Sequence, residues 1–320
     1  MSTASTETSI PRRRASPRGA ALDPLFEAVC LAAATTLLAA LGGVLISLVI
    51  GGWPAISRFG PGFITHVTWD PNRDIYGAAG PIVGTLITAA VALLLALPVA
   101  GGVAFFLVEL CPPLLRRPIG TAVELLAGIP SIDYGMWGLF VFAPFFAKWV
   151  EAPAMAAAPP GTIWESLLSG IPNGSGILAA SVILAVMILP FMAATLRELL
   201  LTVPPQVRES AYGLGATTGE VVMNVTLPYV RRGAIGAVML GLGRALGETM
   251  AVTFIIGNSH GFPKGVFDAG STIASTIANE FNEASGLQSS ALIALGLVLF
   301  FITFTVLALA RLMLRNQARV

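Results

Sequence analysis

Residues 81–109 read PIVGTLITAAVALLLALPVAGGVAFFLVE, an apolar run whose one charged residue, Glu109, stands at its end. A transmembrane helix needs about 20 mostly apolar residues, because it crosses about 30 Å of hydrocarbon at about 1.5 Å per residue. This run is long enough to cross. It predicts an integral membrane protein.

The composition of the whole chain points the same way. Of its 320 residues only 11% are Asp, Glu, Lys or Arg, whereas soluble domains carry about 25%. Apolar types make up 55% of the chain, more than most soluble folds could bury. The formal net charge of +1 gives no basis for nucleic-acid binding. We therefore expect membrane lipid around the chain and no nucleic-acid partner.

Five further windows are similar in length and apolarity to residues 81–109. They are residues 25–52, 119–147, 176–196, 233–257 and 289–310. Together the windows predict an all-α polytopic membrane protein with about six transmembrane helices. Pro98, Pro130 and Pro190 lie inside or near these windows, so we expect them to kink or break the helices.

The charges outside the windows predict which side of the membrane each loop faces. Thirteen arginines, from Arg12 to Arg319, lie in the two tails and in the loops on one side, whereas the other loops hold four Arg or Lys residues. Cytoplasmic loops carry the excess of Lys and Arg, so both termini should be cytoplasmic. The expected organisation is a disordered basic tail at 1–24, one membrane domain at 25–315 and a second tail at 316–320.

The longest predicted cytoplasmic loop, residues 197–232, carries a spaced pattern. Residues 209–215 read ESAYGLG, and after nine more residues 225–228 read VTLP. The pattern resembles the loop E-A-A-x3-G-x9-I-x-L-P of ABC importer permeases, and the resemblance implies docking to an ATPase. The alternative is a helix that lies on the bilayer surface.

Each part of this pattern has an expected structure. A short helix should contain the first three residues, a glycine should break the chain, and a Leu-Pro pair should stop it before the next span. The residues expected to couple this chain to the ATPase are Glu209, Ser210, Ala211, Gly215, Leu227 and Pro228.

No nucleotide site is recognisable in the chain. A phosphate-binding loop needs Gly-x4-Gly-Lys followed by Ser or Thr. The two lysines, Lys148 and Lys264, are followed by Trp149 and Gly265, so neither fits. We expect no catalytic residue, no metal site and no cofactor on this chain, with ATP and Mg²⁺ bound by a partner ATPase. An intramembrane enzyme is an alternative without a recognisable catalytic dyad.

Four ionisable residues lie within or near the predicted spans, namely Glu124, Asp133, Arg244 and Glu248. A charge at the bilayer centre costs about 2.5–3.5 kcal/mol on insertion scales, so each is a candidate for function. Arg244 and Glu248 are four residues apart and would share one face of a helix. Arg244 could donate two hydrogen bonds to an oxyanion while Glu248 holds its side chain, or the two could form a structural ion pair.

Asp133 is harder to interpret, because a carboxylate in an anion path would repel the substrate. It is either a partner for Arg244 or a residue at the edge of the membrane. The predicted substrate pathway comprises Ser131, Asp133, Arg244, Glu248 and Thr249.

Segments along most of the chain closely resemble the PstC family, one of the two permease subunits of bacterial phosphate ABC importers. They are DIYG at 74–77, GPIVGT at 80–85, IPSI and YGMWG at 129–138, ESAYG at 209–213 and GLGRALGETMAVTFIIGN at 241–258. The sister family, PstA, shares the Arg-Ala-x-Gly-Glu-Thr core but not the Met-Ala-Val-Thr-Phe continuation. Asp133 departs from the aliphatic residue expected after Ile132.

The resemblance implies a type I importer fold in the bacterial inner membrane and the passage of inorganic phosphate delivered by an external binding protein. It implies a heterodimer with a PstA-like permease, two PstB-like ATPase subunits and a PstS-like phosphate-binding protein. Alternatives are a permease for sulfate, molybdate or phosphonate, or an ion-coupled secondary transporter, which often shows paired halves that we do not find here.

Overall fold

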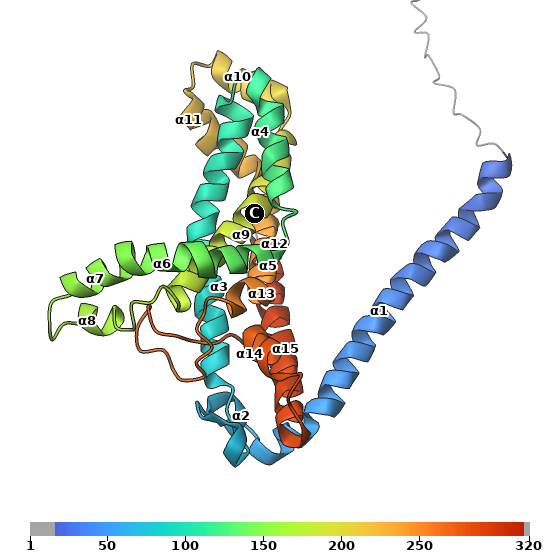
Figure 1. The fold of residues 1–320 in the computed structure, drawn as a ribbon. Helices are drawn as coiled ribbons and strands as arrows, with labels where there is room; N and C mark the ends of the chain where they lie inside the picture. Colours follow the sequence, from blue (N-terminus) through green and yellow to red (C-terminus); the bar gives the residue numbers. More distant parts are fainter. Residues whose placement is uncertain (1–16, 317–320) are drawn as a thin grey trace, which may run out of the picture. The chain divides into compact units, whose positions relative to one another are not determined.

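The computed structural model describes the backbone of residues 17–316 and the side chains of residues 23–312 (Figure 1). The remaining residues of the two expected tails, 1–16 and 317–320, lie outside the described part. The chain divides between Ile50 and Gly51 into two units. The first is the greater part of helix α1 (Pro17–Phe59). Residues 17–24 of the expected tail are thus helical, and a proline at a helix start loses no hydrogen bond.

The second unit is helical apart from one small hairpin. Its helices are α2 (Gly62–Thr65), α3 (Ala79–Phe105), α4 (Pro113–Leu126), α5 (Ser131–Trp137), α6 (Ala143–Phe146), α7 (Ala152–Ala157), α8 (Ile163–Leu167), α9 (Ile177–Leu201), α10 (Pro205–Gly213), α11 (Thr218–Val221), α12 (Leu227–Leu246), α13 (Met250–Thr253), α14 (Ile273–Glu280) and α15 (Gly286–Asn316). Strands β1 (Trp69–Asp70) and β2 (Ile75–Tyr76) pair antiparallel around the 3₁₀ turn Pro71–Arg73.

Four π-helical turns lie in the described chain, and each ends two residues before a proline. They are Phe106–Leu110 before Pro112, Gly138–Phe142 before Pro144, Ala147–Glu151 before Pro153, and Val222–Thr226 before Pro228. Proline has no backbone N–H, so a carbonyl one turn earlier loses its partner. Before Pro144, Pro153 and Pro228 the wider turn lets the helix continue around that gap, whereas the run before Pro112 ends at Leu110. Residues 131–157 and 218–246 are therefore continuous helical runs. The expected stop at Leu227-Pro228 is wrong, because the helix runs through both residues.

Five helical runs among the described residues are long and apolar enough to cross a membrane. They are Asp23–Phe59, Ala79–Leu110, Ser131–Ala157, Ile177–Leu201 and Gly286–Leu312. Four of them overlap the predicted windows 25–52, 81–109, 176–196 and 289–310 over nearly the full length of each window. The protein is therefore a multi-pass helical membrane protein.

The predicted window 119–147 is wrong in its bounds. Helix α4 ends at Leu126, and the next helical run begins at Ser131. The interruption contains Gly128 and Pro130, and a residue that precedes proline disfavours the helical conformation. Pro98 and Pro190, in contrast, lie within the unbroken helices α3 and α9.

The predicted window 233–257 is not one helix either. Helix α12 ends at Leu246, residues 247–249 are not helical, and α13 begins at Met250. Arg231 and Arg232 lie near the beginning of α12 and Arg244 in its last turn, so this helix is much less apolar than the five candidate spans.

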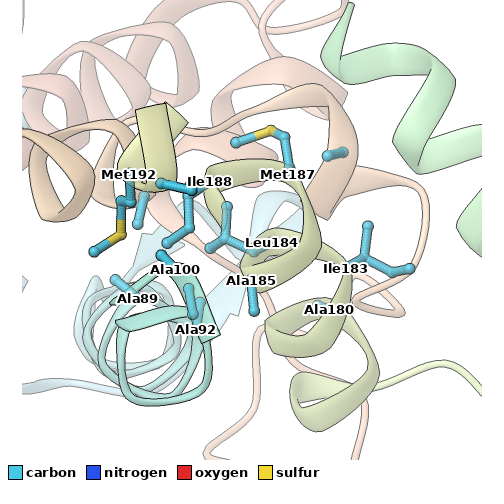
Figure 2. Close-up of a cluster of buried hydrophobic side chains, with 14 of the residues drawn as sticks. Ala89, Ala92, Ala100, Ala180, Ile183, Leu184, Ala185, Met187, Ile188 and Met192 are labelled. Carbon is cyan, nitrogen blue, oxygen red and sulfur yellow. The ribbon is translucent and has the colours of Figure 1, made fainter. Parts of the chain in front are cut away.

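The core of the second unit is the contact between α3 and α9. Helix α3 presents buried alanines at spacings of three and four residues, namely Ala89, Ala92, Ala96, Ala100 and Ala104. They face larger buried side chains of α9, which include Ile183, Leu184, Met187, Ile188 and Met192 (Figure 2). Small residues let two helices approach closely, which is the main source of helix association in lipid.

The Ala79 end of α3 is fixed by backbone contacts. A Cβ atom on Gly84 would overlap the Ser271 carbonyl oxygen, and one on Gly80 would overlap that of His260. Next to Gly84, Thr85 Oγ1 accepts a hydrogen bond of 2.9 Å from the backbone N–H of Ile273. The segment from His260 to Ile273 therefore lies directly on the first turns of α3.

We predict that Gly84→Ala destabilises the protein by about 1–3 kcal/mol, because the added methyl group forces the Ser271 backbone to move. The thermal midpoint of detergent-purified protein should fall by several degrees. Gly101→Ala is the matched control in the same helix, since its Cβ meets no atom within 4 Å. Equal midpoints for the two variants would contradict the close contact.

Candidate translocation site and coupling loop

Arg244 lies in the last turn of α12 with its side chain exposed at the surface of the chain. The guanidinium Cζ lies 5.7 Å from the centre of the Phe191 ring on α9, within the range of a cation–π contact. A positive charge is also favoured at the end of a helix, where carbonyl groups lack partners. These contacts hold the side chain in place, and the ion pairs among the described residues do not include Arg244, so its N–H donors are available to a ligand.

Glu248 lies in the break between α12 and α13. Its Oε1 accepts a hydrogen bond of 3.2 Å from the backbone N–H of Ala251, in the first turn of α13. The predicted pairing on one helix face is wrong, because the helix ends at Leu246, between the two residues. Among the described residues, the ion pairs do not include one between Arg244 and Glu248.

Thr249 follows in the same break and precedes the first residue of α13. Its hydroxyl lies 3.4 Å from the carbonyl oxygen of Gly247, and its own carbonyl accepts a hydrogen bond of 2.6 Å from Thr253 Oγ1. Glu248 and Thr249 therefore both act locally to turn the chain from α12 into α13.

Helix α5 packs against α13 through Gly135. A Cβ at this position would lie 2.9 Å from Phe254 Cδ2 and 3.1 Å from Ala251 Cα, so only glycine fits without displacement. The structure thus brings the first turn of α5, with Ser131 and Asp133, to the region of the break after α12.

Asp133 is exposed in the first turn of α5, where a carboxylate is favoured by the free N–H groups of the helix. It lines an open, mostly apolar hollow of about 300 Å³ with Ile129, Tyr134, Trp137 and Val186. The ion pairs of the described residues do not join Asp133 to Arg244. The expectation that Asp133 pairs with Arg244 is therefore not met among the described residues of this chain.

Glu124 forms an ion pair with Arg197 and not with a residue of the predicted substrate pathway. Its Oε1 lies 2.8 Å from Arg197 Nη1, and the same nitrogen lies 3.2 Å from Glu198 Oε1. Gly120 makes room for this guanidinium, since a Cβ there would lie 3.3 Å from Arg197 Cζ. This cluster joins α4 to the end of α9, so Glu124 serves the contact between these two helices.

The loop at 197–232 has the expected helix and the expected break. Glu209, Ser210 and Ala211 lie in α10, and Gly215 takes a φ of +89°, a conformation that favours glycine. Thr217 and Glu220 form a capping box that starts α11. Leu214 is 90% exposed, and Tyr212 and Met223 are exposed as well. Apolar side chains grouped on an exposed loop are typical of a protein-binding surface.

One ion pair in this loop was not foreseen from the sequence. Arg208 Nη1 on α10 lies 2.9 Å from Glu109 Oε1 at the end of the π-helical turn that follows α3. Only 8% of the Glu109 side chain and 19% of the Arg208 side chain are exposed. In the sequence, Glu109 stands only as the end of an apolar run and Arg208 only as one of several charges in a predicted loop, so neither residue indicates the other as its partner.

A second unforeseen cluster lies near the Ala79 end of α3. Glu280 accepts hydrogen bonds of 2.9 Å from Trp69 Nε1 and Gln288 Nε2, and its other oxygen lies 2.8 Å from His260 Nε2. Trp69 stacks on the His260 ring. Burial raises the pKa of the Glu280 carboxyl, but the hydrogen bonds from His260, Gln288 and Trp69 together hold that pKa below its usual value. The cluster ties the hairpin to α14 and to the segment after α13.

Within the part of the chain that the structure describes, no group of three or more His, Cys, Asp or Glu side chains could hold a metal ion.

The sequence is similar to a well-defined set of transport proteins. Residues 78–318 match the family described as binding-protein-dependent transport system inner membrane component. The phosphate transport system permease protein PstC of Haemophilus influenzae is 52% identical over 298 residues, which are 92% of this chain and 94% of that protein. PstC of Mesorhizobium japonicum is 54% identical over 306 residues, or 94% and 93% of the two chains. PstC of Xylella fastidiosa is 47% identical over 319 residues, or 98% of each.

Solved structures with a similar fold are permeases of ABC importers. A chain of a bacterial ABC transporter involved in alginate import matches with a TM-score of 0.57 at 16% identity, over 92% of this chain and 96% of that one. A chain of the methionine ABC transporter MetNI, in an inward-facing conformation, matches with a TM-score of 0.50 at 17% identity, over 73% and 91%. At such low identity these matches establish the fold alone.

Proposed function

The chain belongs to the family of binding-protein-dependent transport system inner membrane components, and we propose that it is the PstC-type permease subunit through which an ATP-driven importer moves inorganic phosphate. The observation that carries the proposal is the identity of 47–54% with PstC proteins of three bacteria over more than nine-tenths of this chain. The same relatives do not favour sulfate, molybdate or phosphonate as the substrate, nor an ion-coupled secondary transporter.

The charged residues on α5 and α12 support a substrate pathway along one face of the chain. Asp133 and Arg244 are both exposed on helices of the membrane domain. A charge at membrane depth is costly in lipid, so such residues face protein or water. We propose that a PstA-like permease covers this face and that phosphate passes between the two subunits, past Ser131, Asp133, Arg244, Glu248 and Thr249.

Arg244 has the chemistry that an oxyanion path requires. Its guanidinium is always charged and offers donors in a planar fork that matches two phosphate oxygens. The carboxylate of Glu248 is held by the N–H of Ala251, so it lies near the path without neutralising Arg244 in an ion pair. Its negative charge, together with that of Asp133, would weaken anion binding, and a conducting site must release what it binds.

We propose that the complex holds two PstB-like ATPase subunits, which bind ATP and Mg²⁺, and a PstS-like phosphate-binding protein outside. The exposed apolar side chains of the α10 loop, Leu214 above all, support ATPase docking, because apolar groups exposed on a loop are typical of a protein-binding surface. Hydrolysis would then belong to the partner, since neither lysine of this chain fits a nucleotide-binding loop. The excess of arginines beside α10 and in the tails supports two cytoplasmic termini in the bacterial inner membrane.

The direct test of the substrate is radiolabelled phosphate uptake in phosphate-starved bacteria that lack this chain, with and without the gene restored. Arsenate, sulfate and molybdate serve as competitors. Restoring the gene should restore uptake, and arsenate alone should block it. Uptake that is indifferent to this chain, or that sulfate or molybdate blocks, would overturn the assignment.

We expect Arg244→Ala to lower phosphate uptake by at least about tenfold, because each hydrogen bond to a charged group contributes about 1.5–3 kcal/mol. Arg244→Lys, which keeps the charge and loses the planar fork, should retain an intermediate rate. Copurification of the partner subunits with both variants shows that assembly is intact. A normal rate in Arg244→Ala would exclude this residue from the path.

We expect Glu209→Lys to weaken binding of the ATPase, because the reversal changes the charge of an exposed side chain on α10. The matched control is Ser210→Ala on the next residue, which introduces the alanine of the E-A-A pattern. Affinity purification from detergent should recover less ATPase with Glu209→Lys than with Ser210→Ala. If the ATPase copurified equally and hydrolysed ATP in step with transport, the docking assignment would be wrong.

A further inference from the structure

The ion pair between Arg208 and Glu109 joins two elements that are remote in sequence. Arg208 lies one residue before the E-A-A-like segment of α10, and Glu109 lies 99 residues earlier, at the end of the span that begins with α3. Both side chains are largely buried and lie 2.9 Å apart. Opposite charges at this distance and burial hold each other strongly, because little water screens them.

The span to which Glu109 belongs reaches from one end of the second unit to the other. The helical run Ala79–Leu110 has 32 residues, about 48 Å at the α-helical rise. At its Ala79 end, Gly80 and Gly84 touch the carbonyl groups of His260 and Ser271 so closely that no side chain fits between. The run therefore touches α10 at one end and the segment from His260 to Ile273 at the other.

The half of α3 nearer to α10 has room to shift. A partly open apolar cavity of about 190 Å³ lies between α3, α9 and α12, and its lining includes Gly101, Leu196 and Val238. In the other half, Gly80 and Gly84 lie directly against backbone carbonyl groups, which leaves no room for a side chain. A helix shifts more easily where the space beside it is loosely filled, because a close-packed core resists compression.

We propose that the Arg208–Glu109 ion pair is the link through which movement of α10 displaces α3, and that α3 carries the displacement to the segment from His260 to Ile273. Arg208 and Glu109 are then positioning residues of the transport cycle. This proposal rests on the proposed function, because the ATPase supplies the movement of α10. Without the pair, α10 would move with its neighbours α11 and the following π-helical turn while α3 stays behind.

The test uses the whole transporter, purified and reconstituted in liposomes, with phosphate transported per ATP hydrolysed as the readout. Arg208→Glu and Glu109→Arg each place two like charges together and should lower this ratio by about fivefold or more, while ATP hydrolysis continues. The double variant Arg208→Glu with Glu109→Arg restores an ion pair of opposite sense and should restore most of the ratio. Arg117→Glu, a reversal of an exposed charge at the beginning of α4, is the matched control and should leave the ratio unchanged.

A second measurement reports on the segment that contacts the Ala79 end of α3. Ser259→Cys, next to His260, is labelled with a membrane-impermeant maleimide in ATP-trapped and ATP-free transporter. The labelling rate should differ between the two states in the native background and in the double variant, and should not differ in either single variant. A restored ratio without this recovery would contradict the path through α3.

The proposal fails if both single variants keep the native ratio, or if the double variant stays as low as the singles while all subunits copurify. Should Arg208→Glu not assemble, Arg208→Gln, which removes the positive charge without adding a negative one, is judged by the same ratio. A native transporter that moves no phosphate would overturn the proposed function itself. Native transport with unaffected single variants would overturn only the link.

Discussion

The close contact between α3 and α9 is the constraint on which the rest of the second unit depends. In lipid no hydrophobic force drives helices together, so they associate where backbones can approach. The buried alanines of α3 allow this, and the larger side chains of α9 fill the space opposite them (Figure 2). With α3 held along α9, one end of α3 meets α10 through Glu109 and the other meets the segment after α13 through Gly80 and Gly84.

The interruptions of helices lie where the candidate site lies. The chain leaves helical geometry at 127–130, before α5, and again at 247–249, before α13. Free backbone groups are tolerated at membrane depth only where protein or a water-filled cavity satisfies them. Here Glu248 binds the N–H of Ala251, and Gly135 lets α5 pack against α13. The second interruption also leaves Arg244 at the end of a helix. In a continuous helix its N–H donors could pair with Glu248, but the ion pairs of the described residues do not join the two.

Much of the architecture could be predicted from the sequence because hydropathy reports on each segment separately. Four windows, the α10 helix and the break at Gly215 agree with the structure. Windows 119–147 and 233–257 do not, because an average over about 20 residues does not register a break of three or four. The spacing of Arg244 and Glu248 predicted a pair on the assumption of an unbroken helix, and that assumption was wrong. The roles of the candidate pathway and coupling residues remain predictions.

The sequence by itself determined that the chain lies in a membrane, where most of its spans fall and which family it belongs to, because these depend on local composition and on matching segments. Only the tertiary structure decided which charges meet. Glu109 and Arg208 are separated by 99 residues, and Glu124 and Arg197 by 73. No spacing rule joins residues so far apart. Their pairing follows from the tertiary fold, which brings the end of the α3 run, helix α4, the end of α9 and helix α10 together in one region of the second unit (Figure 1). Burial strengthens the Arg208–Glu109 pair in particular, because little water screens it.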